Sequence, residues 1–335
     1  MLVALAQDNE CMAGLGALLS DIANGAIHGE ARQRLTAASL IPLTKPNGGI
    51  RPIGMRETFY RLAMIYCTKY KPVVATELFP SIQFGVAQKS GVERVVHMLR
   101  HIHANAPAGH VIVSTDIKNA FNTRSRHDMM DALLQQPSIN HMWRAFHWSY
   151  NQSSPLCMYD GSMLTNVIMS SEGVVQGDPL ASLAFSLSMQ HIYEQCIAGT
   201  SVRALAIVDD FYLYGDASEV SKCFDKLQTL LHDVGLMLSV PKCAALPSLA
   251  THTAHESMPE HMSLINDMCA TRGFSCVDML PVLGVCISHR EQDASAWHVK
   301  DVESLEQYWS RLTDELLPSR VSYDLLTKCA QHRLS

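Results

Sequence analysis

The stretch ALAIVDDFYLYG (residues 204–215) constrains the fold of this chain more than any other. It places Asp209 and Asp210 side by side within an apolar, β-branched and aromatic run of the kind that forms strands. Adjacent like charges repel each other, and acidic residues are depleted from strands. The pattern predicts a strand, a tight turn and a second strand, with both carboxylates at the turn. An isolated Asp-Asp pair is most often a solvated hairpin turn, so its meaning depends on the rest of the chain.

A third carboxylate has a matching context. The segment HVIVSTDIKNAF (110–121) is typical of a buried strand, and it ends on Asp116. Neighbouring carboxylates become tolerable when a divalent cation lies between them, and Mg²⁺ prefers carboxylate oxygens together with substrate phosphates. Two such ions about 4 Å apart stabilise the attacking and the leaving oxygen in phosphoryl transfer. Asp116, Asp209 and Asp210 are therefore candidates for a metal-dependent phosphoryl-transfer site.

Composition limits the class of protein. With 335 residues, 47% hydrophobic and 17% charged, the chain is globular and long enough for two or three subdomains. A net charge of −6 argues against a strongly basic nucleic-acid binder, so a nucleic-acid partner would require clustered Lys and Arg. No apolar run has the length of a membrane span, and the ten cysteines form no CxxC pair. We expect an intracellular protein with reduced thiols and no membrane partner.

Hydrophobic periodicity and turn residues predict a mixed order of helices and strands. His252, His255 and His261 are either metal ligands or part of a solvated loop, and the loop is favoured because no recognised ligand spacing accompanies them. Strands do not alternate regularly with helices, which favours an α+β fold with helices packed on a sheet. The expected elements are a helix over 12–38, a hairpin over 39–55 turning at Asn47-Gly48-Gly49, helices over 56–70 and 90–103, a loop and helix over 174–196 with Asp178 as N-cap, a helix over 221–238, a strand pair over 280–288 and a helix over 299–317.

Seven segments in this order resemble the motifs of reverse transcriptases. They cover Leu40 to Ser288, and their order is far more specific than any single motif. The long segment between the first of them and Asp116 is similar to non-LTR (LINE-type) retrotransposon enzymes, with group II intron proteins as a nearby alternative. The segments are KPNGGIRPI (45–53), QFGVAQKSGVE (83–93), STDIKNAF (114–121), VVQGDPLAS (174–182), IVDDF (207–211), GLMLSVPKC (235–243) and VLGVCIS (282–288).

The resemblance implies a right-hand polymerase with fingers, a palm built on an antiparallel sheet, and a partial thumb. The expected domains are an N-terminal helical extension (1–38), fingers (39–109), a palm (110–288) with a fingers-like insertion near 122–173 and a polar insertion at 247–275, and a partial thumb (289–335).

The resemblance also implies a reaction and its residues. An RNA-directed DNA polymerase, a nucleotidyltransferase, would add dNTPs to the 3′-hydroxyl of a DNA primer on an RNA template. Asp116 and Asp209 would bridge two Mg²⁺ ions, with Mn²⁺ as an alternative, and Asp210 would complete the catalytic pair. The residues expected at the dNTP are Lys45, Arg51, Phe121, Gln176, Gly177 and Lys242, and Gly284 is expected at the primer backbone. Independently of the resemblance, Arg56 and Arg61 belong to a predicted basic helix that would bind nucleic acid electrostatically.

The sequence departs from the family pattern beside the catalytic pair. Where the family usually has an aromatic residue followed by a small one, this chain has Ile207 and Val208. Two other functions stay open: an RNA-directed RNA polymerase on the same palm, and a catalytically silent nucleic-acid-binding scaffold or fragment. A separate endonuclease domain, absent from this sequence, is an expected partner, and the location is nuclear if the chain is a eukaryotic retrotransposon product.

Overall fold

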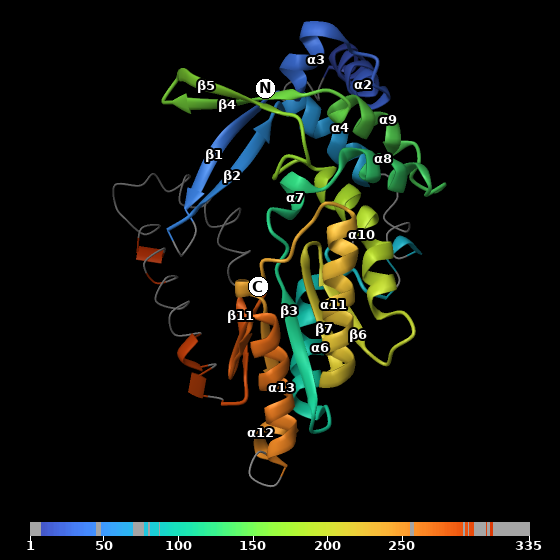
Figure 1. Ribbon diagram of the computed structural model, residues 1–335. Coiled ribbons are helices and arrows are strands. Elements are labelled where there is room, and N and C mark those ends of the chain that lie inside the picture. Colours follow the sequence, from blue (N-terminus) through green and yellow to red (C-terminus); the bar gives the residue numbers. More distant parts are fainter. Residues whose placement is uncertain are drawn as a thin grey trace. The chain divides into compact units, whose positions relative to one another are not determined.

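The strand HVIVST (β3, His110–Thr115) lies at the centre of a five-stranded sheet in the computed structural model of the protein (Figure 1). Its β-branched residues favour an extended backbone, and Val111, Ile112 and Val113 are buried. All pairings are antiparallel except that between β8 and β9. The strand order is β6 (Arg203–Ile207), β7 (Asp210–Asp216), β3, β8 (Ala244–Pro247) and β9 (Ser275–Cys276). The predicted α+β fold with an antiparallel palm sheet is confirmed.

The structure describes residues 8–44, 48–69, 77–79, 81–86, 88–254, 258–290, 292–293, 295–297, 306 and 309–310. The chain forms two compact units, Met1–Cys276 and Val277–Ser335.

Helices cover both faces of the five-stranded sheet. Helix α10 (Ala181–Ile197) contacts β6, and α11 (Ala217–Asp233) contacts β3 and β7. Val111 and Val113 belong to the same hydrophobic cluster as these two helices, whereas Ile112 is buried outside that cluster. Because successive side chains of a strand point to opposite faces, Ile112 faces the other side, where α6 (Gly91–Asn105) packs on β3 and β6.

A second sheet joins segments that are far apart in the sequence. Strands β1 (Ala38–Thr44) and β2 (Ile50–Arg56) pair along their whole length, which confirms the predicted hairpin, although residues 45–47 of its turn lie outside the described residues. β1 also pairs in parallel with β4 (Ser154–Asp160), and β4 forms a second hairpin with β5 (Met163–Ser170). The order β2-β1-β4-β5 places these two hairpins side by side (Figure 1).

Several helix boundaries differ from the sequence predictions. The helix expected over 12–38 is two helices, because α2 ends at Asn24 and Gly25 caps it in a left-handed conformation. The helix expected to have Asp178 as its N-cap begins at Ala181, with Leu180 as the N-cap instead. The other helices among the described residues up to Cys276 are α2 (Asn9–Asn24), α3 (Gly29–Thr36), α4 (Thr58–Lys69), α7 (Ala120–Thr123), α8 (Arg126–Leu134), α9 (Met142–Tyr150), the 3-10 helix η1 (Val240–Lys242), α12 (Leu249–Thr253) and α13 (Pro259–Arg272).

The segment predicted as a polar insertion (247–275) contains regular structure. His252 lies in α12 and His261 in α13, so the prediction of a loop is wrong for these two residues, and His255 lies outside the described residues. Helix α13 buries Ile265, Met268 and Cys269, and it packs on α11 and β8. These three apolar residues are spaced three and four positions apart, so they lie on one face of the helix and join the core although most of the segment is polar.

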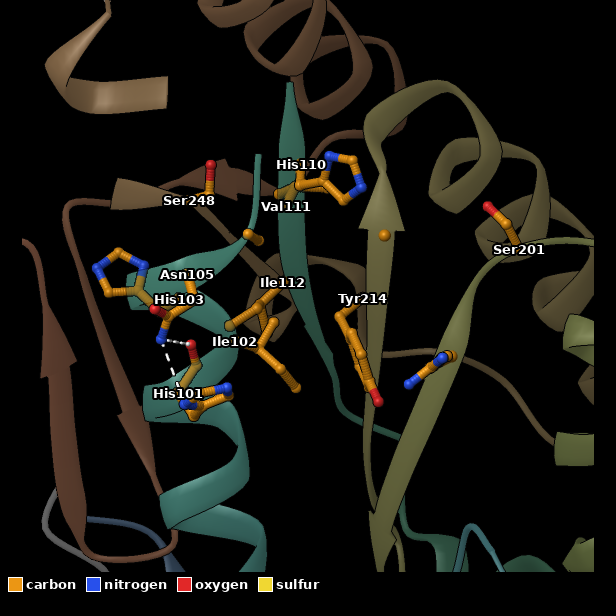
Figure 2. A pocket seen from close by; sticks show the side chains of 13 residues that line it. His101, Ile102, His103, Asn105, His110, Val111, Ile112, Ser201, Tyr214 and Ser248 are labelled. Atoms are coloured by element: carbon orange, nitrogen blue, oxygen red, sulfur yellow. Dashed lines mark hydrogen bonds between the residues drawn. The ribbon is translucent and has the colours of Figure 1, made fainter. Parts of the chain in front are cut away.

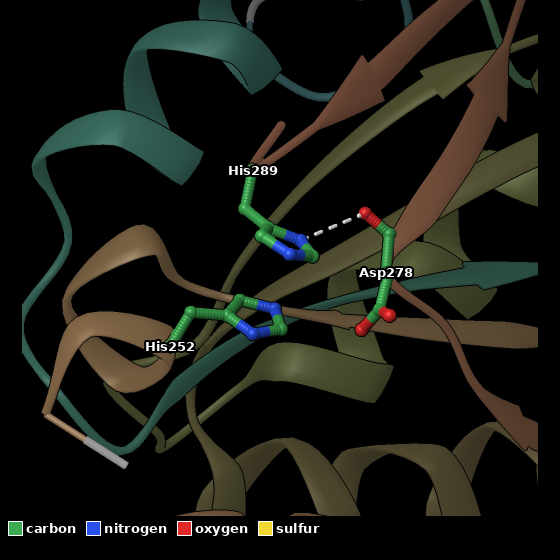
Figure 3. A group of neighbouring side chains, drawn as sticks. All are labelled: His252, Asp278 and His289. Atoms are coloured by element: carbon green, nitrogen blue, oxygen red, sulfur yellow. Dashed lines mark hydrogen bonds between the residues drawn. The ribbon is translucent and has the colours of Figure 1, made fainter. Parts of the chain in front are cut away.

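The unit Val277–Ser335 contains the predicted strand pair. β10 (Met279–Val282) and β11 (Val285–Ser288) form an antiparallel hairpin, which turns through Leu283 and Gly284, both at positive φ. At its open end the Nδ1 atom of His289 lies 3.2 Å from the backbone oxygen of Asp278 (Figure 3). Most of the helix predicted over 299–317 falls outside the described residues.

Candidate active site

The Asp-Asp pair lies at the tip of a two-residue hairpin. Ile207 of β6 pairs with Asp210 of β7, so that Val208 and Asp209 form the turn. The predicted strand, turn and strand are present, but Asp210 is the first residue of β7 and not part of the turn. Thr115 of β3 pairs with Phe211, which places Asp116 beside Asp210 at the same end of the sheet. We call Asp116, Asp209 and Asp210 the acidic cluster. Residues separated by more than ninety positions in the sequence thus meet because β3 and β7 are neighbours.

The electrostatics of the acidic cluster reflect its crowding. Partial burial, followed by the charges of Asp209 and Asp116, raises the pKa of Asp210 from 3.8 to about 6. Partial burial raises the pKa of Asp209 as well, and the charge of Asp116 adds to this effect. The Arg51 guanidinium on β2 acts in the opposite direction on both groups. The charge of Arg51 therefore acts on both carboxylates of the pair.

Lys242 reaches the acidic cluster from another direction. The Ser239 N–H donates a hydrogen bond of 2.7 Å to the backbone oxygen of Asp116, which fixes the segment after α11 alongside β3. The ammonium of Lys242 consequently lies 3.2 Å from Oδ2 of Asp116. Both side chains are partly solvent-exposed, so this ion pair adds little to stability. It places a positive charge at the cluster.

The turn itself is strained. Val208 has a φ of 58°, a conformation that suits glycine at the first central position of a two-residue hairpin turn. A β-branched residue there is a genuine outlier, and such strain costs about 1–3 kcal/mol.

Gln176 and Gly177 form a loop that is docked on β2. The Gly54 N–H donates a hydrogen bond of 2.8 Å to the backbone oxygen of Gln176. Gly177 has a φ of 102°, and a Cβ atom at this position would lie 3.0 Å from the backbone oxygen of Gly54. A residue with a side chain would therefore be strained and crowded here. Within the described part of the chain, the side-chain oxygen of Gln176 is buried and accepts no hydrogen bond.

Phe121 lies on the short helix α7, five residues beyond Asp116. Its ring stacks on Phe185 of α10, with ring centroids 4.8 Å apart and planes inclined by 13°. Phe121 is partly buried, so one part of the ring belongs to the core and another part remains accessible. The structure fixes the position of this ring relative to the palm.

The prediction that Arg56 binds nucleic acid is wrong, because Arg56 is 3% exposed. It is the last residue of β2, and its Nε lies 2.7 Å from Oδ2 of Asp178. The hydroxyls of Tyr60 and Tyr150 donate to the same Asp178 oxygen at 2.6 and 2.7 Å. We call these four residues the buried ion-pair network. Its members are 0–5% exposed, and it ties the end of β2 to the loop that carries Gln176 and Gly177.

The other predicted site residues are more scattered. Arg61 is exposed on α4, where a nucleic acid could reach it. Gly284 lies in the hairpin of the unit Val277–Ser335, and Lys45 falls outside the described residues.

A cavity of about 280 Å³ lies at the opposite end of the palm strands (Figure 2). It is lined by the end of α6 and by the starts of β3 and β6, including His110 and Arg203, and by Tyr214 near the end of β7. The same strands carry the acidic cluster at their other ends, so this cavity contains no predicted site residue.

The family model described as "Reverse transcriptase (RNA-dependent DNA polymerase)" matches residues 43–271, more than half of the chain. The chain belongs to the reverse transcriptase family. This confirms the resemblance in the sequence motifs, and the enzyme class predicted from them, a nucleotidyltransferase, is that of the family.

This reverse transcriptase is 29% identical over 187 residues to the "Retrotransposable element SLACS 132 kDa protein" of Trypanosoma brucei gambiense. The match covers 56% of the chain but only 15% of that much longer relative. It agrees with the predicted similarity to LINE-type retrotransposon enzymes.

Two telomerase structures share the fold. Apo telomerase from Candida tropicalis, truncated from its C-terminal domain, has a TM-score of 0.50 at 12% identity, over 76% of this chain and 53% of that chain. Telomerase from Candida albicans in complex with the TWJ fragment of telomeric RNA has a TM-score of 0.51 at 11% identity, over 78% and 45% of the two chains. At such identities the likeness concerns the fold alone, and it agrees with the predicted fingers and palm. In the part of the reverse transcriptase that the structure describes, no helix combines the length and the apolar character needed to cross a bilayer.

The raised pKa of Asp210 predicts a pH-dependent stability effect. Because the folded-state pKa of about 6 exceeds the ordinary value of 3.8, folding is progressively disfavoured as the pH rises from about 4 through 6. We expect Asp210→Asn to have a higher melting temperature than the wild type at pH 7 in EDTA, and an equal one near pH 4. Thermal unfolding at both pH values measures this, and a variant less stable than wild type at pH 7 would contradict it.

Proposed function

We propose that this reverse transcriptase is an RNA-directed DNA polymerase of a non-LTR retrotransposon, which adds dNTPs to the 3′-hydroxyl of a DNA primer. The observation that carries the proposal is the acidic cluster at one end of the palm sheet, with Lys242 in contact with Asp116 and the charge of Arg51 acting on Asp209 and Asp210. Adjacent carboxylates with raised pKa values and flanking cations suit a substrate that carries both phosphates and metal.

The donor set fits a hard divalent cation. All three side chains of the cluster offer carboxylate oxygens, the ligands that Mg²⁺ and Mn²⁺ prefer. In this structure the carboxylate oxygens of Asp116, Asp209 and Asp210 do not all lie within 4.8 Å of one another. The three side chains would therefore rotate toward each other to bind one cation. Two Mg²⁺ ions held by Asp116, Asp209 and Asp210 would supply charge neutralisation at the attacking and leaving oxygens.

The chain's own residues would position the substrates. Arg51 and Lys242 would bind the triphosphate, the first through a forked guanidinium and the second as a point charge released from Asp116. Lys45, in the turn of the same hairpin as Arg51, would add to them. The reaction needs no nucleophilic side chain, because the primer hydroxyl attacks the α-phosphate and pyrophosphate leaves.

Gln176, Gly177 and Phe121 would select the nucleotide. The loop docked on β2 would bring the backbone at Gly177 close to the new base pair, and Gln176 would accept a hydrogen bond there only after its buried side-chain oxygen turns outward. Phe121, fixed by Phe185, would leave no room for a 2′-hydroxyl.

The proposed division of the chain is that of the sequence prediction, with fingers at 39–109, a palm at 110–288 and a partial thumb at 289–335. Arg61 and the hairpin at Gly284 would contact the RNA template and the primer. A separate endonuclease domain would cut the target, and nuclear location is proposed for a eukaryotic host.

Primer extension tests the proposal directly. The substrate is a poly(rA)/oligo(dT) duplex with Mg²⁺ and dTTP, and Asp209→Asn is compared with the wild type. Incorporation by the wild type alone supports the polymerase and places Asp209 at the metal. A folded wild type that binds the duplex but incorporates nothing would overturn it in favour of a silent nucleic-acid-binding protein.

Phe121→Val should weaken discrimination against ribonucleotides. With space beside the sugar, the ratio of kcat/KM for dTTP to that for UTP should fall at least about tenfold, while kcat/KM for dTTP changes far less. Single-nucleotide incorporation with each substrate gives both values from one preparation, so dTTP is the internal control. An unchanged ratio would show that the ring of Phe121 does not face the sugar.

A further inference from the structure

Gln83 is a buried polar residue for which the proposed reaction has no use. It lies in the segment 81–86 and forms an isolated parallel β-bridge with Ala206 of β6. The Ala206 N–H donates to the backbone oxygen of Ile82, and the Phe84 N–H donates to that of Ala206, both at 2.8 Å. The segment thereby reaches the base of the catalytic turn, and Gln83 itself is 1% exposed.

The side chain of Gln83 binds the backbone of the strained turn residue on both sides. The Val208 N–H donates a hydrogen bond of 2.8 Å to Oε1 of Gln83, and Nε2 of Gln83 donates one of 3.1 Å to the backbone oxygen of Val208. The Gly85 N–H also donates to Oε1 of Gln83, at 2.8 Å, which holds the amide in this orientation. An amide side chain supplies one acceptor and two donors, so it can pair with both backbone groups of one residue.

Two further contacts enclose the same residue. A Cβ atom at Gly85 would lie 2.8 Å from both the backbone nitrogen and Cγ2 of Val208. The backbone of the segment 81–86 therefore packs directly against Val208, with no space for a side chain at position 85. The hydroxyl of Tyr193, which is fully buried on α10, lies 3.4 Å from the backbone oxygen of Val208. The Tyr193 ring stacks on Phe211, at 4.1 Å between centroids, next to Asp210.

We propose that Gln83 is a positioning residue for catalysis, which holds Val208 at positive φ and thereby orients the Asp209 carboxylate toward Asp116. The carboxylates of the acidic cluster repel one another, and Val208 resists the conformation that the turn needs. Without the Gln83 clamp the turn would relax, and Asp209 would move away from the cluster. The inference rests on the proposed function, and it concerns how that site is held.

The test compares Gln83→Met with a variant that needs no clamp. Methionine has nearly the shape of glutamine but forms neither hydrogen bond to Val208. We expect kcat for dTTP incorporation to fall about 10- to 100-fold and the Mg²⁺ concentration for half-maximal activity to rise, with primer–template affinity unchanged. In a Val208→Gly background, where glycine adopts positive φ freely, the same Gln83→Met change should cost less than about threefold.

Gln88→Met is the matched control. Gln88 lies in the same motif, and its amide hydrogen bonds to the Phe79 backbone and to Arg94, away from the turn. We expect Gln88→Met to retain wild-type kcat and Mg²⁺ dependence. An equal loss in Gln83→Met and Gln88→Met would overturn the inference. So would an equal loss from Gln83→Met in the wild-type and the Val208→Gly backgrounds.

Hydrogen exchange separates this inference from the proposed function. In the wild type, amide hydrogen exchange across residues 204–212 should be slow. Gln83→Met should accelerate exchange about five- to tenfold at Val208, while exchange in the rest of the protein and the melting temperature stay unchanged. This readout requires no polymerase activity. If Gln83→Met accelerates exchange at Val208 but the wild type shows no polymerase activity, the clamp is supported and the polymerase is rejected. If Gln83→Met leaves exchange at Val208 unchanged, the clamp is rejected.

Discussion

Arg56→Met should lower the free energy of unfolding by about 3–5 kcal/mol, because it leaves the carboxylate of Asp178 buried without a counter-charge. The Arg56–Asp178 pair is almost fully buried, and both tyrosine hydroxyls of the network donate to the same oxygen of Asp178. The guanidinium also lies 4.9 Å from the ring centre of Tyr60 and 5.0 Å from that of Tyr150. Urea denaturation of the wild type and the variant measures the difference.

Arg61→Met is the matched control for this stability effect. Arg61 lies on α4, only five residues away, but it is exposed, so its replacement should change stability by less than about 0.5 kcal/mol. Asp178→Asn should be less damaging than Arg56→Met, because a neutral amide still accepts from Tyr60 and Tyr150. A loss below about 1 kcal/mol for Arg56→Met would mean that the buried ion pair is not what secures the Gln176–Gly177 loop.

Asp116→Asn should reduce incorporation by about 10³-fold or more while the protein remains folded. The change removes one charged oxygen ligand where the transition state gathers charge, and losses of about 10²–10³ follow from deleting even a single neutral donor at such a site. The charge of Asp116 contributes to the raised pKa values of Asp209 and Asp210, so both should fall in the variant. Single-turnover incorporation and carboxyl titration by NMR measure the two effects.

Asp267→Asn serves as the comparison for Asp116→Asn. Asp267 is exposed on α13, so its loss should leave incorporation and the titration of the acidic cluster unchanged. Incorporation within about tenfold of wild type in Asp116→Asn would remove this residue from the metal site and contradict the proposed mechanism.

Much of the fold could be predicted from the sequence because its signals are local. The turn at Asn47-Gly48-Gly49, the β-branched run before Asp116 and the run around Asp209-Asp210 each specify an element by short-range preferences. The resemblance to reverse transcriptases then supplied the order in which distant elements meet. Whether Asp116, Lys242 and Arg51 converge follows from strand neighbours, which no local pattern contains.

The misplacement of Arg56 shows where such signals mislead. The helix predicted over 56–70 included both Arg56 and Arg61, but the helix begins at Thr58 and Arg56 still belongs to β2. Successive side chains of the strand IRPIGMR point to opposite faces, so Arg56 lies on the same buried face as Gly54. This alternation was the one feature of the sequence that could have indicated that Arg56 is buried. Gln83 stands in the motif QFGVAQKSGVE, but nothing in that motif indicates its contact, because the contact is with the backbone of a residue 125 positions away.

The central place of β3 has a consequence for how the protein is made. Its hydrogen-bonded neighbour β7 ends 106 residues later, since His110 pairs with Asp216. At about 5–20 residues per second, a ribosome needs roughly 5–20 s to deliver β7 after β3 has emerged. During this interval the apolar strand HVIVST has neither its partner strand nor the helix α11 to cover it. We therefore expect β3 to be the segment of the nascent chain that chaperones bind, and slower growth at low temperature to raise the yield of folded enzyme.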